Sequence, residues 1–390
     1  MPHRIALAQW RRVWANAQST ASLAPLARAR DHRREVLGRM LALAAAGVAP
    51  ARAAEPQSGA SAPIVAALLP LDGATFGRAA AAVQSGITAA WNLASPALRP
   101  QLLFVATGER PADALSGYSK ALASGARVVI GPLIRDQASA LTGALATQPP
   151  VKVPTLALNV PEVPLLPQNL FAFGLPAEDE ARQIARIALG EGHRRAAILT
   201  QTGPFSRRLQ QAFAEAFGAG GGQVVGTTAA LTDPQSLARI ARSVTTAQPD
   251  MLFLACDLAH ARLVRPFIEQ RLPTYATSHL WSGPIEPALV HDLDGTRLLD
   301  APWLAAADHP AVMAYPRSQP ALPPELERLY ALGIDAWRLA EIALATGTLA
   351  GATIDGVTGR LEVAPDRRVR RDALPATLRQ GRLEPTDPPR

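Results

Sequence analysis

Cysteine is almost absent from this sequence of 390 residues, and with it several kinds of chemistry. The single cysteine, Cys256, excludes a disulfide within the chain, and its apolar neighbours predict a core residue rather than a nucleophile. The seven histidines are scattered without the spacing of metal ligands. No nucleophile elbow or phosphate-binding loop occurs. These absences disfavour an enzyme and predict neither a metal nor a cofactor.

Two segments imitate functional motifs. Gly218, Gly220, Gly221 and Gly222 resemble a dinucleotide-binding loop, but they follow a predicted helix and precede a strand, the reverse of the order that a phosphate cradle needs. We therefore expect them to end the helix. The acidic run 178–180 resembles a pair of catalytic carboxylates, but at the first turn of a predicted helix it is explained by the helix dipole.

Excess positive charge is confined to the N-terminal region. Residues 1–53 contain nine arginines and two acids, which leaves 39 − 9 = 30 basic and 32 − 2 = 30 acidic residues downstream. The remainder is therefore neutral and offers no basic face for nucleic acid.

The N-terminal region has the features of an export signal. Arg33 and Arg34 form a twin-arginine pair, and the apolar run 40–49 is too short to span a membrane but suits a signal sequence. Ala51 and Ala53 supply the small residues of a cleavage site. No cysteine follows that could accept a lipid. We expect export as a soluble periplasmic protein without a membrane span, by the twin-arginine or the general secretory route.

Strands and helices alternate through the rest of the sequence, which predicts an α/β fold. Short apolar runs such as 64–69, 126–130 and 251–256 are each followed by a segment of helical periodicity. This alternation indicates right-handed crossovers and parallel sheets. The proline-rich segment 161–167 then separates one such series from a second. We predict two Rossmann-like lobes with parallel sheets, joined by multiple crossovers around a cleft.

The predicted domain organisation follows from these segments. Residues 1–53 form the signal and leader, and 54–62 form a linker. The first lobe comprises 63–165 and about 297–348, and the second comprises 166–296 and about 349–376. Residues 377–390, polar and rich in proline, form a flexible tail.

Ligands of open α/β sheets bind beyond the carboxyl ends of the strands. Polar and aromatic residues at these strand ends are therefore the candidate cleft residues: Asp72, Thr75, Phe76, Thr107, Gly131, Pro132, Asn159, Gln201, Phe205, Asp257, Thr277, Ser278 and Trp281. The aromatic members could stack on a ligand and the others could bind its polar groups. The alternative is that these residues form turns and helix caps. Arg135 could pair with an acidic group of a ligand, but a solvated charge at a helix start is the favoured interpretation.

Several longer segments resemble one known family. They are FGLPAEDEARQIA (173–185), LPTYATSHLWSG (272–283), DLDGTRLLDAPWL (292–304), LERLYALGIDAWRLA (326–340) and GVTGRLEV (356–363). Together they resemble the C-terminal domain of the LppC/LpoA family of penicillin-binding-protein activators, over about residues 63–385. The resemblance implies a type I periplasmic-binding-protein fold, similar to the leucine-binding components of importers. It also implies a non-enzymatic protein that stimulates a bifunctional peptidoglycan synthase.

Two functions remain open at this point. The first is a regulator of peptidoglycan synthesis that acts through a lobe surface. The second is a solute-binding receptor of an ABC-type importer, which closes on an amino acid, a peptide or a wall fragment. A receptor needs an open cleft lined by polar groups, whereas a regulator can have its cleft filled by its own side chains.

Overall fold

The computed structural model describes residues 62–386, apart from 97–98, 148–150 and 230–233. The described residues all belong to one compact unit. The predicted export signal and, except for Ala62, the predicted linker lie outside the described residues.

The first lobe is a five-stranded parallel sheet with the order β2-β1-β3-β4-β5. Its strands are β1 (Ile64–Leu69), β2 (Gln101–Ala106), β3 (Ala126–Ile130), β4 (Thr155–Ala157) and β5 (Leu170–Ala172). Its helices are α2 (Gly77–Leu93), α3 (Pro111–Ala123), α4 (Arg135–Thr147) and, much later in the chain, α11 (Pro324–Thr346).

Helices cover both faces of this sheet, which explains why β1 is apolar at successive positions. Val65, Ala67 and Leu69 pack in the core cluster with α2 and α11, whereas Ala66 and Leu68 pack in the cluster with α3 and α4. Helices α2 and α11 cross in direct backbone contact. A Cβ atom on Gly86 would lie 1.9 Å from the carbonyl oxygen of Tyr330, so the crossing requires glycine there.

The second lobe is a seven-stranded sheet with the order β15-β14-β10-β9-β8-β6-β7. Its strands are β6 (Arg195–Thr200), β7 (Gln223–Ala229), β8 (Met251–Ala255), β9 (Thr274–Ala276), β10 (Arg297–Asp300), β14 (Leu374–Arg379) and β15 (Arg382–Pro385). Its helices are α5 (Ala177–Gly190), α6 (Pro204–Ala219), α7 (Pro234–Ala247) and α8 (Leu258–Val264), with 3-10 turns at Arg265–Phe267, Ser278–Leu280, Pro287–Leu289 and His291–Leu293. Phe253 of β8 packs against α6, where its ring stacks on Phe213 at 4.3 Å.

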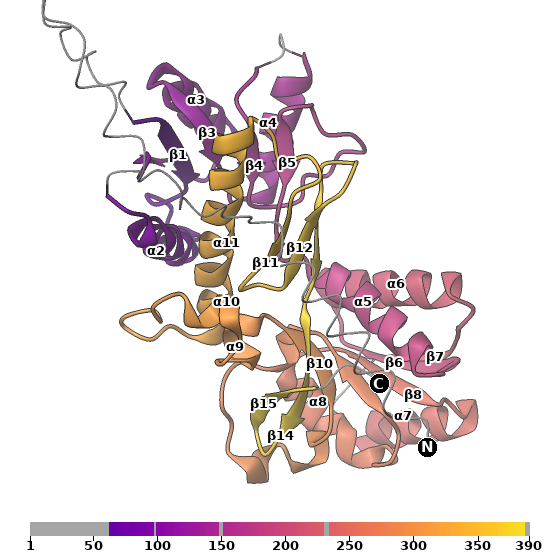
Figure 1. The fold of residues 1–390 in the computed structure, drawn as a ribbon. Helices are drawn as coiled ribbons and strands as arrows, with labels where there is room; N and C mark the ends of the chain where they lie inside the picture. The colour runs from indigo at the N-terminus through magenta and orange to yellow at the C-terminus, as the bar shows by residue number, and fades with distance from the viewer. Residues whose placement is uncertain (1–61, 97–98, 148–150, 230–233, 387–390) are drawn as a thin grey trace, which may run out of the picture. The chain divides into compact units, whose positions relative to one another are not determined.

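A small antiparallel sheet lies between the two larger ones. It contains β11 (Thr353–Asp355), β12 (Arg360–Val363) and β13 (Val369–Asp372), and Figure 1 shows it between α11 and α5. The short helices α9 (Pro302–Ala305) and α10 (Pro310–Met313) precede α11. The chain passes between the lobes three times, after β5, after β10 and after β13.

Two of the predicted lobe assignments are wrong. Residues 297–300, assigned above to the first lobe, form β10, which pairs in parallel with β9 of the second lobe. Residues 353–372, assigned above to the second lobe, form the separate small sheet. A β-bridge between Ala172 and Arg368 joins this sheet to the sheet of the first lobe. A short apolar run does not reveal which sheet it joins, because each sheet buries strands of the same composition.

The predicted flexible tail is also wrong from residue 377 to residue 385. β14 and β15 form an antiparallel hairpin, and its two-residue turn consists of Gln380 and Gly381, both with positive φ (47° and 74°). This is the backbone geometry that suits a tight hairpin. Gly381 also lies against the backbone of Ile285, where a Cβ atom would be 1.9 Å from the carbonyl oxygen.

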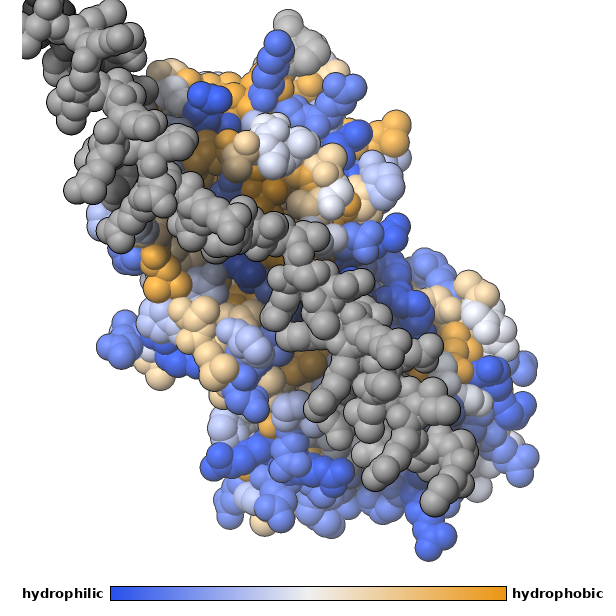
Figure 2. All heavy atoms as spheres, in the orientation of Figure 1, coloured by the Kyte–Doolittle hydropathy of each residue, from blue (hydrophilic) through white to orange (hydrophobic). Residues whose placement is uncertain are grey.

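The fold class is confirmed: both large sheets are α/β layers built mainly from parallel strands. In the view of Figure 2, hydrophilic residues cover most of the visible surface of the second lobe, as expected when apolar side chains fill the layers beneath. Among the described helices, none combines the length and the hydrophobicity that crossing a bilayer requires.

Candidate functional site

The loop after β1 ends at the N-terminus of α2, where free N–H groups commonly bind anions. Here an internal carboxylate occupies that position. The backbone N–H groups of Thr75 and Phe76 each donate to Oε1 of Glu109 at 2.7 Å. These bonds, led by that of Phe76, lower the pKa of Glu109. Asp72, Thr75 and Phe76 are exposed, but the backbone N–H donors of Thr75 and Phe76 that could face a ligand already bond to Glu109.

The other candidates from the first lobe are either buried or bonded within a turn, so they do not face a ligand. Thr107, Gly131 and Pro132 are buried, and Thr107 Oγ1 has no partner among the described residues. The amide of Asn159 donates to Leu133 O at 3.1 Å, and its oxygen accepts from the next backbone N–H at 3.0 Å. Asn159 therefore closes a turn, as in the alternative interpretation.

Three candidates from the second lobe also have internal partners. The side-chain oxygen of Gln201 accepts from the backbone N–H of Asp257 at 2.9 Å. Asp257 caps α8, accepting from the N–H of His260 at 2.9 Å. Phe205 packs against the ring of His279 with centroids 4.6 Å apart. These groups order the strand ends among themselves.

Ser278 lies in a buried charged network that joins the crossings. Its N–H and Oγ donate to the two carboxylate oxygens of Glu180 at 2.8 and 3.1 Å. Arg371, beside the third crossing, donates to the same carboxylate at 2.7 Å, and the two charged side chains are only 6% and 5% exposed. Glu180 is thus a buried hydrogen-bond acceptor, and the helix dipole alone does not explain why an acidic residue stands at this position of the run 178–180.

Arg328 of α11 extends this network to the second crossing. Its guanidinium donates to both oxygens of Asp300 at 2.8 and 2.6 Å, and to the carbonyl oxygens of Ser278 and Trp281 at 3.1 Å. Burial opposes the charge of Arg328, but the bonds to Asp300 outweigh it and raise the pKa of the guanidinium. Thr277, Ser278 and Trp281 are buried and do not line an open cleft.

Helix α5 also binds the third crossing through Gln183. The side-chain amide of Gln183 donates to Ala373 O at 2.9 Å, and its oxygen accepts from Ala373 N at 3.0 Å. Glu180 and Gln183 are three residues apart and therefore lie on one face of the helix. One face of α5 thus holds the chain where it enters the second lobe for the last time.

The groove between the lobes is formed by other residues than those predicted. It has a volume of about 920 Å³ and lies between the β3–α4 and β4–β5 loops, helices α5 and α6, and the small sheet. Eight arginines and seven carboxylates line it: Arg135, Arg182, Arg186, Arg208, Arg360, Arg368, Arg370 and Arg371, with Glu162, Glu178, Asp179, Glu215, Glu362, Asp366 and Asp372. The predicted cleft is therefore present, but none of the thirteen candidates lines this groove.

Most of these charges are paired within the groove. Arg208 bonds Glu178 at 2.6 Å, and Arg135 reaches Glu162 at 3.3 Å, so Arg135 is a groove residue with a partner rather than an isolated solvated charge. The exposed pairs contribute little stability individually, because water screens them. They give the groove a surface of alternating sign.

Three charged residues on the small sheet lack such a partner within the described part of the chain. Arg360 and Glu362 on β12, and Arg370 on β13, are exposed and line the groove. Glu362 and Arg370 are opposite each other in the register. The signal in the sequence is DRRVRRD (366–372), in which the inward-facing Val369 and Arg371 alternate with the exposed Arg370 and Asp372. This groove suits a partner or ligand that carries both charges.

No cluster of histidine, cysteine or carboxylate residues with the geometry of a metal site occurs among the described residues. Burial raises the pKa of the Cys256 thiol to about 12, and this thiol is therefore not a nucleophile.

Two α/β lobes with parallel sheets, three crossings and a groove between them define a type I periplasmic-binding-protein fold. The chain belongs to the family described as "LppC putative lipoprotein", whose profile matches residues 58–381. The expected family is thereby confirmed.

Relatives in this family have known names. The penicillin-binding protein activator LpoA of Pectobacterium parmentieri is 30% identical over 312 residues, which are 68% of this chain and 45% of that protein. The LpoA of Edwardsiella piscicida is 31% identical over 69% of this chain and 44% of its own. The chain spans about half the length of the curated relatives it matches.

Solved structures share the fold. A "putative branched-chain amino acid ABC transporter" from Chromobacterium violaceum is 34% identical, with a TM-score of 0.69 over 81% of this chain and 99% of that one. The C-domain of LpoA from Haemophilus influenzae, a regulator of PBP1A, has a TM-score of 0.70 over 83% of this chain and 100% of that one, at 20% identity.

Proposed function

We propose that the protein acts in the periplasm as a non-enzymatic regulator of peptidoglycan synthesis, by binding a bifunctional peptidoglycan synthase. Family membership and the activator names of its relatives support this proposal. So does the charged groove, because two surfaces of alternating sign can select each other by electrostatic complementarity.

One observation carries the choice of a regulator. At the carboxyl ends of the strands, most of the polar groups that a solute receptor would offer to its ligand already bond to the protein itself. Glu109 accepts hydrogen bonds from the N–H groups of Thr75 and Phe76, and Glu180 accepts them from the N–H and hydroxyl groups of Ser278. A ligand would have to displace the carboxylates of Glu109 and Glu180 to use these donors. Recognition is therefore assigned to the charged surface of the small sheet.

The test is binding of the exported protein to a bifunctional synthase, with reversal of one charge in the groove. Arg370→Glu should weaken binding by about tenfold or more, because facing like charges in an interface costs over about 1.4 kcal/mol. Arg262→Glu is the matched control, since Arg262 is an exposed arginine on α8 outside the groove. Equal binding by both variants, or no binding by the parent protein, would refute the proposal.

A solute receptor is the second candidate. The groove volume of about 920 Å³ favours it, as does the similarity to the Chromobacterium violaceum protein over 99% of that chain. Thermal unfolding with amino acids, peptides and muropeptides separates the two. A ligand at about a hundred times its dissociation constant should add about 2.7 kcal/mol of stability. A saturable shift without synthase binding would establish the receptor instead.

A further inference from the structure

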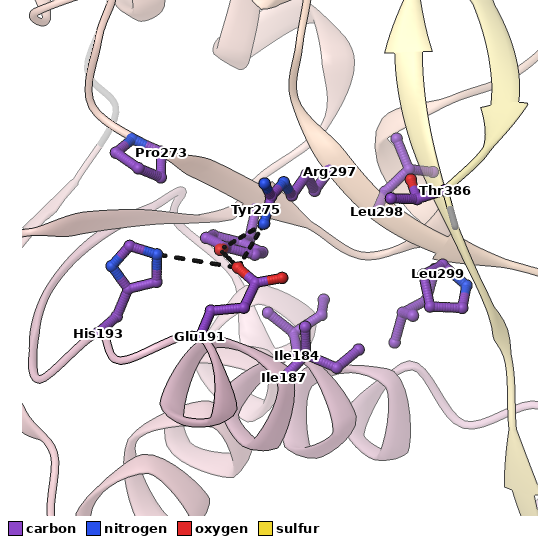
Figure 3. Close-up of a pocket in the computed structure, with 11 residues that line it drawn as sticks. Ile184, Ile187, Glu191, His193, Pro273, Tyr275, Arg297, Leu298, Leu299 and Thr386 are labelled. Carbon is purple, nitrogen blue, oxygen red and sulfur yellow. Dashed lines mark hydrogen bonds and ion pairs between the residues drawn. The ribbon is translucent and has the colours of Figure 1, made fainter. Parts of the chain in front are cut away.

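The second lobe contains a cavity separate from the groove. It has a volume of about 520 Å³ and lies between helix α5 and strands β9, β10 and β14 (Figure 3). Pockets of this size commonly hold a small ligand or a few side chains.

The walls of this cavity are mainly apolar. Ile184 and Ile187 of α5 form one side, and Leu299, Pro273 and Pro375 contribute to the others. A ligand that fills the space must therefore be largely aliphatic or aromatic, since burial of apolar surface is its main source of affinity.

One end of the cavity carries a polar cluster. The Tyr275 hydroxyl and Nη1 of Arg297 both donate to the same oxygen of Glu191, Oε2. The Arg297 guanidinium lies 5.7 Å from the centre of the Tyr275 ring. His193 completes the cluster, with its ring edge-on to Tyr275 at 5.9 Å. Burial raises the pKa of Tyr275, so its hydroxyl stays a donor at neutral pH.

Several hydrogen-bonding groups of this cluster remain available. The second oxygen of Glu191, Oε1, has no partner among the described residues, and Figure 3 shows it turned away from Tyr275 and Arg297. Only Nη1 of Arg297 makes hydrogen bonds within the same part of the chain, which leaves Nε and Nη2 as donors. The cavity thus offers one acceptor and a set of donors side by side.

The charges of the pair also restrict the ligand. Glu191 and Arg297 neutralise each other, so neither a free carboxylate nor a free ammonium gains a net attraction. A peptide group matches the arrangement, because it carries one N–H donor and one C=O acceptor and has no net charge. Its transfer into the cavity also avoids the large cost of desolvating an ion.

We propose that this cavity binds a neutral peptide segment with a bulky apolar side chain. The side chain fills the space against Ile184, Ile187 and Leu299, the backbone N–H donates to Glu191, and the C=O accepts from Arg297. The site lies outside the groove, so this inference goes beyond the proposed function and does not depend on it.

Three probes that share a phenyl ring test the charge class. They are N-acetyl-L-phenylalaninamide (neutral), 3-phenylpropionate (anion) and phenethylamine (cation), titrated into the full chain and followed by ligand-observed NMR. We expect the neutral amide to bind about five- to tenfold more tightly than either ion, the effect of one or two hydrogen bonds. Tighter binding of an ion, or no saturable binding of the amide, would overturn the proposal.

Variants locate the site. Ile187→Trp should fill the cavity and weaken amide binding at least about tenfold, whereas Leu289→Trp, at an exposed leucine outside it, should have no effect. Thr386→Trp, on the opposite side, serves if the first variant does not fold. Amide binding that survives both blocking variants would place the site elsewhere and refute the assignment.

Glu191→Gln provides a readout that loss of folding cannot imitate. It removes the negative charge but leaves Arg297 in place, so the preferred probe should change from the amide to 3-phenylpropionate. If the order of affinities stays the same, the Glu191–Arg297 pair is not the recognition element.

Discussion

Replacing Arg371 by methionine leaves the buried carboxylate of Glu180 without its cation. The two side chains are 6% and 5% exposed, so water cannot compensate for the loss. Removing one partner of a buried pair costs about 3–5 kcal/mol. A unit of about 330 residues has an unfolding entropy of about 0.7 kcal/mol/K, so its melting temperature should fall by about 4–7 °C. Differential scanning calorimetry measures this shift directly.

The control lies in the same groove. Arg186→Met breaks the pair with Asp372, which is 3.9 Å long and has side chains 60% and 67% exposed. An exposed pair contributes at most about 1 kcal/mol, so the melting temperature should change by less than about 1.5 °C. Equal shifts for both variants would refute the claim that Glu180 depends on Arg371.

A double variant tests the mechanism of the loss. In Glu180→Met/Arg371→Met no uncompensated charge remains, and apolar replacements of a buried pair are often neutral. We therefore expect the double variant to be more stable than the sum of the single variants predicts, by about 1 kcal/mol or more. Simple additivity would mean that the carboxylate finds another partner.

Two further predictions concern the first lobe. Gly86→Ala should lower the free energy of unfolding in urea by about 1–3 kcal/mol, because the new methyl group would meet the backbone of α11. Gly143→Ala on α4, where a Cβ atom would have nothing within 4 Å, should raise it by up to about 1 kcal/mol. A larger loss of stability for Gly143→Ala than for Gly86→Ala would contradict the close crossing of α2 and α11. Because the pKa of Glu109 is lowered from its ordinary value of 4.5, its carboxylate should stay charged, and keep its hydrogen bonds to Thr75 and Phe76, when the pH falls below 4.5. The bonds should be lost only when the pH falls through the lowered pKa of Glu109. The amide resonances of Thr75 and Phe76 should therefore titrate with a midpoint below pH 4.5. Glu109→Gln should abolish that titration, and a midpoint above 4.5 would contradict the assignment.

The sequence predicts the α/β class because each strand and helix carries its own periodic signal. The apolar run of β1 requires cover on both faces, and the acid-rich first turn of α5 indicates where that helix begins. The sheet to which a strand belongs is a matter of long-range pairing. The sequence of β10 is compatible with either lobe, and the hairpin of β14 and β15 depends on positive φ at Gln380, which is uncommon for that residue.

The candidate site was predicted less well, for a physical reason. Position at the end of a strand places a side chain near the cleft, but it does not reveal whether another side chain already binds it. Ser278 is at the expected edge, yet it bonds to Glu180, 98 residues away in the sequence. The unpaired arginines of the groove come from the small sheet, whose location between the lobes is a tertiary feature. The pattern in the sequence that marks this strand is the alternation of inward-facing Val369 and Arg371 with exposed Arg370 and Asp372.

The antiparallel pairing of β14 with β10 also has a consequence for how the protein is made. The second sheet begins at residue 195 but lacks two of its seven strands until residues 374–385 have been synthesised. Until then β10 is an open edge, and such edges are prone to pair with other chains. A chain that lacks residues 374–385 should therefore be prone to aggregate, and limited proteolysis of truncated chains should show that the second lobe becomes resistant only when this hairpin is present.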